Sequence, residues 1–291
     1  MYKKISLFLT LFLFTAMYVK AQESIVVSDT LSGWDYGWST GINGSQASYS
    51  NWSQGGINNI AVTGSSTFRA YFRESRFSYG FLINTRYGQT KIEGEGTRKT
   101  DDRLSVRNRF LYDIGREGGD FSVYANINFR TQFDRGFNFG AGPDGEDLLI
   151  SNFMAPAYFT QNTGLTYIPN EQFSFEAGLG LRQTIVRDTN LSTQYGLDEG
   201  DTFRNEAGLN LGASYEQNVA TNLIMSSTVE TFTNVNKALS STDVYFSSEI
   251  TGRINNLMNA SVRLDLVYDD DFSKQLQVRQ SLSLGVSFIL I

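Results

Sequence analysis

Arginine and carboxylate side chains recur in the polar phase of several segments in which polar and apolar residues alternate, and they are the best candidates for chemistry in this sequence. Arg107 and Arg109 lie two residues apart, and Glu176 lies in the polar phase of a segment rich in phenylalanine. The planar guanidinium group suits bidentate pairing with carboxylates in crowded, partly dehydrated places, so these residues predict a charged lining of an enclosed space. The candidate lining residues are Arg69, Arg86, Arg107, Arg109, Arg130, Arg182, Arg263, Arg279, Glu176, Glu206, Glu249 and Asp265.

Two arrangements of this charge are open. A ring of basic side chains would form an anion-selective constriction in a pore. The same arginines, paired with the carboxylates, would instead form an internal salt-bridge network that fills and stiffens the protein.

The composition lacks the residue types that most enzyme and metal sites use. The chain contains no histidine and no cysteine, which excludes Ser-His-Asp and Cys-His nucleophile systems and His-ligated zinc. Glu176, Glu206 and Glu249 could act as a paired-carboxylate hydrolase, but their arginine neighbours favour ionised, structural pairing. The acidic clusters near 101–102, 144–147 and 269–271 do not match the EF-hand spacing and are interpreted as solvated loop charge, bridged through divalent cations to lipopolysaccharide phosphates. We expect no catalytic residue, metal site or cofactor.

An alternation of apolar and polar residues indicates the strands that would hold these side chains. Phe121, Val123 and Ile127 alternate with polar residues, and the same pattern recurs along the chain, which predicts strands with one apolar and one polar face. The predicted strands lie near 36–49, 58–73, 78–90, 103–113, 120–133, 156–168, 172–186, 203–217, 220–234, 242–254, 259–269 and 276–290.

Connection length separates a membrane barrel from a soluble sandwich or lipocalin-like fold. Short connections alternate with longer ones, among them 91–102 and 134–155. Outer-membrane barrels have short periplasmic turns, long extracellular loops and an even number of strands. We therefore predict an all-β fold, a transmembrane antiparallel up-and-down β-barrel of about 12 strands.

The two ends of the chain fit export to the outer membrane. Residues 1–21 begin with two lysines, Lys3 and Lys4, followed by an apolar run and a small-residue ending, the features of a cleaved secretory signal peptide. We expect a short periplasmic segment at 22–35 and the barrel at 36–291. The last strand alternates as such barrels require, although its aromatic residue is Phe288 and the terminal residue is Ile291.

The charge balance and Trp52 give two further expectations. Removal of the leader leaves 21 basic against 30 acidic residues, a net charge of −9, which is unsuited to nucleic acid. Trp52 lies within a turn-forming stretch, NWSQGG, and is expected to anchor the extracellular rim at the lipid interface. A position inside the lid of a ligand site, or packing on a neighbouring loop, is the alternative for Trp52.

Several stretches taken together resemble a known family. SQASYSNWSQGGINN (45–59), RKTDDRL (98–104), RTQFDRGF (130–137), ISNFMAPAY (150–158) and LVYDDD (266–271) are similar to a domain-of-unknown-function family of Bacteroidota outer-membrane β-barrel proteins. The resemblance implies a barrel in the outer membrane with no assigned activity, so it transfers no site residues.

These observations lead to two expectations for function. The first is a narrow channel or transporter for small polar solutes, anions among them. The alternative is a filled, non-conducting barrel that acts as a subunit or partner of an outer-membrane protein assembly. The expected surroundings are outer-membrane lipid and lipopolysaccharide, and the sequence leaves open whether the 134–155 loop plugs the interior.

Overall fold

The computed structural model describes residues 25–47, 58–170, 172–269 and 273–290. The expected signal peptide at 1–21 and Trp52 lie outside these residues.

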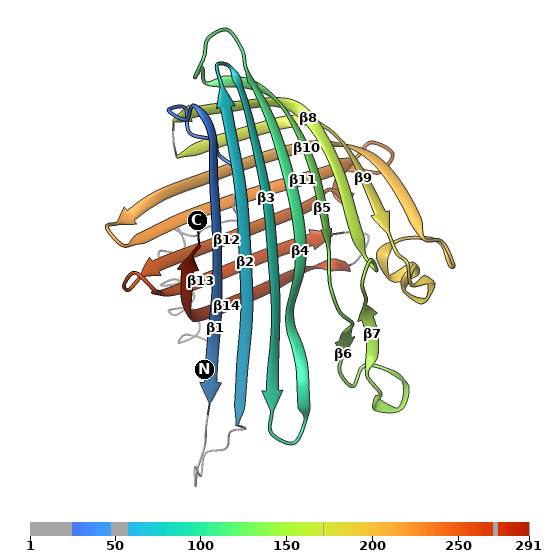
Figure 1. Cartoon of the computed structure of the whole chain (residues 1–291). Coiled ribbons are helices and arrows are strands. Elements are labelled where there is room, and N and C mark those ends of the chain that lie inside the picture. Colours follow the sequence, from blue (N-terminus) through green and yellow to red (C-terminus); the bar gives the residue numbers. More distant parts are fainter. Residues whose placement is uncertain (1–24, 48–57, 171, 270–272, 291) are drawn as a thin grey trace, which may run out of the picture.

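Twelve long antiparallel strands form a closed barrel (Figure 1). Each strand pairs with its neighbours along the chain, and β14 returns to pair with β1, where Ser39 lies opposite Ile289. The barrel strands are β1 (Gly33–Ala47), β2 (Asn59–Glu74), β3 (Phe77–Ile92), β4 (Gly96–Asp113), β5 (Phe121–Thr131), β8 (Ala157–Asn170), β9 (Phe173–Ile185), β10 (Phe203–Ala220), β11 (Leu223–Asn234), β12 (Asp243–Arg253), β13 (Met258–Asp269) and β14 (Ser273–Ile289). The predicted fold class and strand count are confirmed.

The apolar faces of the strands point outward. In β9, Phe175 and Leu179 are 44% and 62% exposed, whereas Arg182, in the opposite phase, is 7% exposed. A soluble sandwich would bury the apolar phase in a dry core, so this distribution fits a barrel whose outer surface faces lipid. Among the described residues, no helix is both long and apolar enough to cross a membrane.

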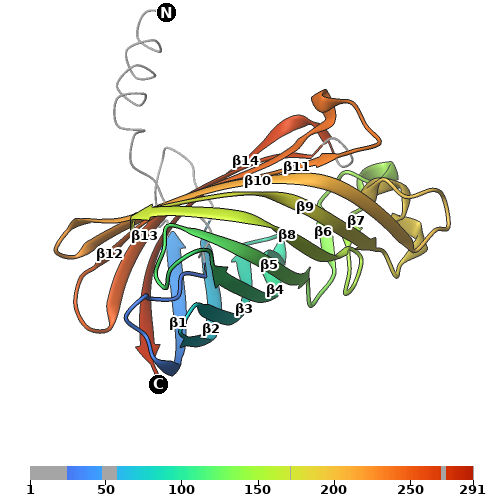
Figure 2. The ribbon, with the colours of Figure 1, turned by 90° about the horizontal axis from the view of Figure 1, so that it is seen from above.

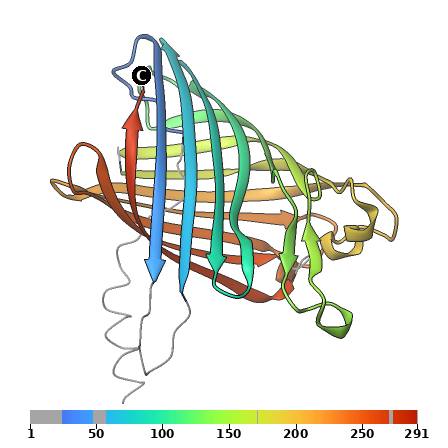
Figure 3. The ribbon, with the colours of Figure 1, turned by 60° about the horizontal axis from the view of Figure 1, so that its bottom comes forward.

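Connections at one end of the barrel are short. β2 is joined to β3 by Ser75 and Arg76, and β10 to β11 by Thr221 and Asn222. The start of β1 and the end of β14 lie at this end (Figure 3). We call it the short-turn end.

One expected long loop at the opposite end is a strand extension. Residues 91–102 were expected to form a loop, but β3 continues to Ile92 and β4 begins at Gly96, which leaves only Glu93, Gly94 and Glu95 as a turn. Gly94 and Gly96 have positive φ values of 82° and 85°, so glycine supports the reversal. Cross-strand pairing stabilises the polar residues beyond the apolar band, which periodicity alone does not detect.

The long connections carry small elements of their own. A hairpin of β6 (Gly136–Asn138) and β7 (Leu148–Ser151), with the 3-10 turn η1 (Pro143–Gly145), lies between β5 and β8. The turns η2 (Thr189–Leu191) and η3 (Thr193–Tyr195) lie between β9 and β10, and η4 (Leu239–Ser241) lies between β11 and β12. Figure 3 shows the β6–β7 hairpin and the β9–β10 connection next to each other.

A small apolar core joins these two connections. Ala155 and Val186 are fully buried, and Leu191 is buried against them. The loop at 134–155 therefore packs on the 187–202 connection, because this is where its apolar side chains leave water.

The residues before β1 turn into the barrel at its short-turn end. Ile25 and Val27 are 4% and 7% exposed and pack against Leu82 on the inner face of β3. A Cβ on Gly80 would lie 2.0 Å from Cγ2 of Ile25, so the glycine leaves room for this side chain. Strand β1 begins at Gly33, three residues before the predicted start of the barrel at 36, and residues 25–31 of the segment at 22–35 lie at the short-turn end.

Candidate functional site: the charged lumen

Strand register places the predicted lining residues on the inner face. Arg69 lies opposite Leu82, Leu82 opposite Arg107, and Arg107 opposite Asn128. Residues directly opposite one another share a face of the sheet, so this row continues around one side of the barrel to Arg182 and Glu206.

Four cavities of about 80, 150, 210 and 350 Å³ lie inside the barrel. We call them cavities 1 to 4 in that order. Ten predicted residues line them: Arg86, Arg107, Arg109, Arg130, Arg182, Arg263, Arg279, Glu176, Glu249 and Asp265. The other two lie beside them, with Arg69 paired to Asp35 at 2.9 Å and Glu206 paired to Arg182 at 3.0 Å.

A buried cluster surrounds Arg182. Its guanidinium group contacts the carboxylates of Glu206 and Asp243 at 3.0 and 2.5 Å, and all three residues are less than a tenth exposed. Asn234 also donates to Glu206 at 2.9 Å, and the guanidinium lies 4.3 Å from the centre of the Phe232 ring. This part of the lumen is a filled salt-bridge network.

A second network of charges joins the last two strands, β13 and β14, to β3 and β4. Asp265 accepts from Arg263 and Arg279 at 2.9 Å each, and Arg279 also lies 3.8 Å from Asp101. Asp101 in turn pairs with Arg86 at 2.8 Å. Four strands, β3, β4, β13 and β14, are tied together by these charges.

Nearer the short-turn end, Arg109 pairs with Glu176. The same guanidinium lies 5.6 Å from the ring centre of Tyr124. Both charged residues line cavity 1 together with Ile25, so the N-terminal segment reaches the lumen wall at this depth.

Arg73 holds the N-terminal segment by charge. It contacts Asp113 at 2.7 Å and Asp29 of the segment at 3.0 Å, and it is 4% exposed. Asp113 also accepts from Ser122 at 2.9 Å. The pairing gives the segment a polar anchor beside its apolar one.

Three charged residues that face the cavities have no charged partner in the described part of the chain. Arg103 lines cavities 3 and 4, and Arg130 and Glu230 both line cavities 2 and 4. Arg130 stacks on Tyr158, with its guanidinium carbon 4.9 Å from the ring centre. Arg130 and Glu230 are exposed to the lumen space.

Sequence interpretation missed Arg103 and Glu230. Arg103 has the same strand phase as Arg107 and Arg109, so phase alone could have identified it, but it lies at the predicted strand boundary. The importance of Glu230 comes from its missing partner, which no sequence pattern reveals.

The wider cavities carry an excess of positive charge. Cavity 3 is lined by four arginines and one glutamate, and cavity 2 by three arginines and one glutamate. Arg86, Arg263 and Arg182 are paired with carboxylates. The excess is therefore carried by the arginines without such a partner among the described residues, Arg103 in cavity 3 and Arg130 in cavity 2. Low-dielectric walls focus the field of such side chains, which raises the local concentration of anions.

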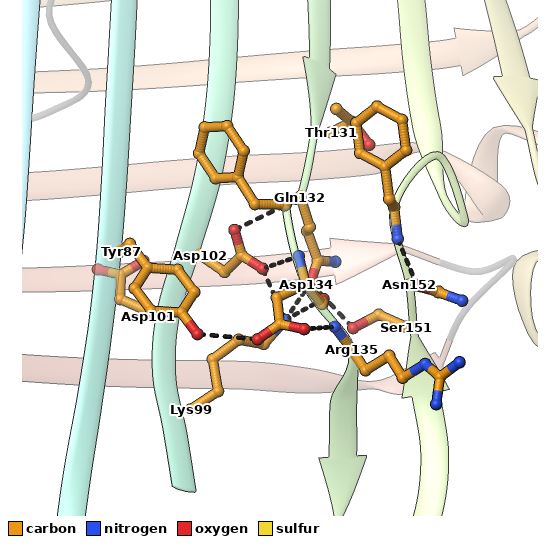
Figure 4. Close-up of polar contacts among 12 residues, drawn as sticks. Tyr87, Lys99, Asp101, Asp102, Thr131, Gln132, Asp134, Arg135, Ser151 and Asn152 are labelled. Carbon is orange, nitrogen blue, oxygen red and sulfur yellow. Dashed lines mark hydrogen bonds and ion pairs between the residues drawn. The ribbon is translucent and has the colours of Figure 1, made fainter.

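The long loop after β5 is tied to the barrel rim by a polar cluster (Figure 4). Asp102 accepts from the backbone N–H groups of Phe133 and Asp134 at 2.8 and 2.9 Å, and it pairs with Lys99 at 2.7 Å. Lys99 also donates to the backbone oxygen of Asp134 at 2.6 Å, and the Tyr87 hydroxyl donates to the Asp134 carboxylate at 2.8 Å. None of the four cavity linings includes a residue of the loop at 134–155.

The hydrogen bonds to Asp134 determine the pH at which this anchor is lost. Donation by the Tyr87 hydroxyl and then by the Arg135 N–H lowers the pKa of the Asp134 carboxyl group. A carboxyl whose pKa is lowered on folding contributes its stabilisation above its unfolded pKa and loses it as the pH falls through the lowered value. The anchor should therefore persist at neutral pH and weaken only in strong acid.

We expect Asp102→Ala to release the start of this loop. Hydrogen bonds to a charged group contribute about 1.5–3 kcal/mol, so the opening equilibrium of the Phe133 and Asp134 amides should rise about tenfold or more. Hydrogen exchange of these two amides measures the change. Asp147→Ala is the control, because among the described residues Asp147 accepts a hydrogen bond from Gly140 of the same loop and does not tie the loop to the barrel. Unchanged exchange in Asp102→Ala would show that the loop is held by other contacts.

Comparison with known proteins supports part of the family resemblance. Residues 45–137 match a family described as "Protein of unknown function (DUF3078)". The match includes the stretches at 45–59, 98–104 and 130–137, and the stretches at 150–158 and 266–271 lie beyond it. No curated protein matches the chain.

Solved structures with a similar outline are remote. The "COG4313 outer membrane channel from Pseudomonas putida F1" is 8% identical, with 91% of this chain and 99% of that chain covered and a TM-score of 0.41. The "NanC porin" is 8% identical, with 86% and 98% covered and a TM-score of 0.42. The "Translocator domain of autotransporter NalP from Neisseria meningitidis" is 14% identical, with 89% of each chain covered and a TM-score of 0.38. Similarity at this level carries no information about the solute or the activity.

Proposed function

We propose that this protein is a narrow outer-membrane channel for small polar solutes, with a preference for solutes that carry a negative charge. The observation that supports the proposal most directly is the pair Arg103 and Arg130, which face the wider cavities without a carboxylate partner in the described chain. An arginine that only stiffened the barrel would be paired, as Arg182 and Arg263 are.

Adjacency of the cavities provides a route for the solute. Cavities 2 and 3 share Arg107, cavities 2 and 4 share Arg130, and cavities 3 and 4 share Arg103. A small anion could therefore pass from one arginine to the next, since conduction needs several weak sites and not one strong site. The apolar outer face keeps the strands in lipid while this polar interior remains hydrated.

We expect the double variant Arg103→Gln with Arg130→Gln to reduce anion selectivity in planar bilayers. Removal of two uncompensated positive charges lowers the anion concentration in the lumen, so the reversal potential in a salt gradient should move toward that of a non-selective pore. The control is Arg187→Gln, which removes one positive charge from an exposed connection outside the cavity linings.

Two outcomes would contradict the proposal. Unchanged selectivity in the double variant would show that these arginines do not select the ion. Absence of any conductance would instead favour the filled barrel that serves as a subunit of an envelope assembly. This conclusion requires that variants which displace the N-terminal segment, residues 25–31, from the barrel end are also silent.

A further inference from the structure

We propose that cavities 2 and 4 together form a binding subsite for zwitterionic solutes, namely amino acids and short peptides. In this subsite Arg103 and Arg130 hold the solute carboxylate and Glu230 holds the ammonium group. The inference rests on the proposed channel function and adds the class of solute.

The two arginines form one anion-binding wall. Arg130 on β5 lies opposite Ser105 on β4, and Arg103 lies two residues before Ser105 on the same face. Such diagonal neighbours have Cβ atoms about 7–8 Å apart, a separation that two long guanidinium side chains can bridge around one carboxylate. Stacking on Tyr158 holds Arg130 in the lumen without neutralising its charge.

Glu230 lies on β11, which β10, β9 and β8 separate from β5 in the closed barrel. Figure 2 shows β10, β9, β8, β5 and β4 following one another around the barrel. Glu230 of β11 lines cavity 4 with both Arg103 and Arg130, so the unpaired charges of opposite sign enclose the same space.

An unpaired carboxylate discriminates against simple anions. The other inward acids that we predicted from sequence, Glu176, Glu206, Glu249 and Asp265, each contact an arginine. A free carboxylate beside an anion route repels a solute that is only negative, whereas it attracts an ammonium group on the same solute. The combination of Arg103, Arg130 and Glu230 is therefore complementary to a molecule with both charges.

The space fits a solute of this size. Cavity 4 measures about 350 Å³ and cavity 2 about 150 Å³, and they share Arg130, Glu230 and Tyr245. Small-molecule sites commonly measure about 300–1,000 Å³.

The test is solute uptake by proteoliposomes that contain the full barrel. Four probes of similar size are compared: alanyl-alanine, N-acetyl-alanyl-alanine, a dicarboxylate and a neutral sugar. The native protein is expected to pass alanyl-alanine several-fold faster than N-acetyl-alanyl-alanine, which lacks the ammonium group. Glu230→Gln is expected to remove this preference and to speed the dicarboxylate, whereas Glu199→Gln, on an exposed connection, should leave both rates unchanged.

The outcomes separate this inference from the channel function. Two outcomes overturn the zwitterion subsite alone, provided that the dicarboxylate still enters. One is equal rates for the two dipeptides in the native protein, and the other is a preference for alanyl-alanine that survives Glu230→Gln. Failure of every probe to enter, also after release of the N-terminal segment, overturns the channel and the subsite together. The comparison of the two dipeptides changes the solute and not the protein, so it remains decisive if Glu230→Gln does not fold.

Discussion

Replacement of Ile25 and Val27 by aspartate should raise the single-channel conductance several-fold. The two side chains fill an apolar pocket beside Leu82 inside the short-turn end, and both are less than a tenth exposed. A carboxylate there loses its hydration, and the nearby Arg109 is already paired with Glu176, so burial of the new charge should cost more than the apolar contacts contribute. The segment should therefore leave the barrel end and open a wider path to cavity 1. Planar-bilayer recordings measure the conductance.

Val26→Asp is the matched control, because this neighbouring side chain is 50% exposed. It changes the charge of the segment without disturbing the buried contacts, so conductance should stay at the native level. Gly80→Ala provides an independent route to the same result, since its Cβ would lie 2.0 Å from Ile25 and displace that side chain. Native conductance in both the double aspartate variant and Gly80→Ala would mean that the segment does not limit the flow.

Arg182→Ala should destabilise the barrel more than the loss of any exposed ion pair. Arg182 balances two buried carboxylates, Glu206 and Asp243, which are 4% and 3% exposed. Removal of one partner from a buried pair costs about 3–5 kcal/mol when the remaining charge is uncompensated. Arg204 still lies 3.2 Å from Glu206, so we expect the loss to fall at the low end of this range. Urea-induced unfolding in lipid vesicles, followed by tryptophan fluorescence, measures the free energy of unfolding.

Arg69→Ala serves as the control for this measurement. Arg69 and Asp35 form an ion pair whose side chains are 42% and 43% exposed, so the change should cost less than about 1 kcal/mol. The triple variant Arg182→Ala, Glu206→Gln, Asp243→Asn should recover part of the loss, because it removes the stranded carboxylates as well. A loss no larger for Arg182→Ala than for Arg69→Ala would show that water reaches the Arg182 cluster and screens it.

The fold could be predicted from the sequence because its main determinant is local. Alternation of apolar and polar residues repeats in every strand, and a strand of period two exposes one set to each face. The same phase argument applies to Arg107 and Glu176, which lie on the inner face, and would have included Arg103. The 91–102 segment was missed because its residues are polar on both faces beyond the lipid, so periodicity carries no signal there.

Partner choice and the path of the chain ends could not be predicted in this way. Arg130 and Arg182 have the same strand phase, yet Arg182 pairs with two carboxylates and Arg130 stacks on a tyrosine. The difference depends on contacts between strands far apart in sequence, such as that of Arg182 with Asp243.

The sequence by itself determined the twelve strands, the outward apolar face and the inward guanidinium groups, because each depends on the spacing of neighbouring residues. Only the tertiary structure decided which charges cancel and which remain free, and that residues 25–31 enter the barrel end. Barrel closure brings Arg103, Arg130 and Glu230 around one cavity across the lumen, and such proximity is a property of three-dimensional register that no local pattern contains.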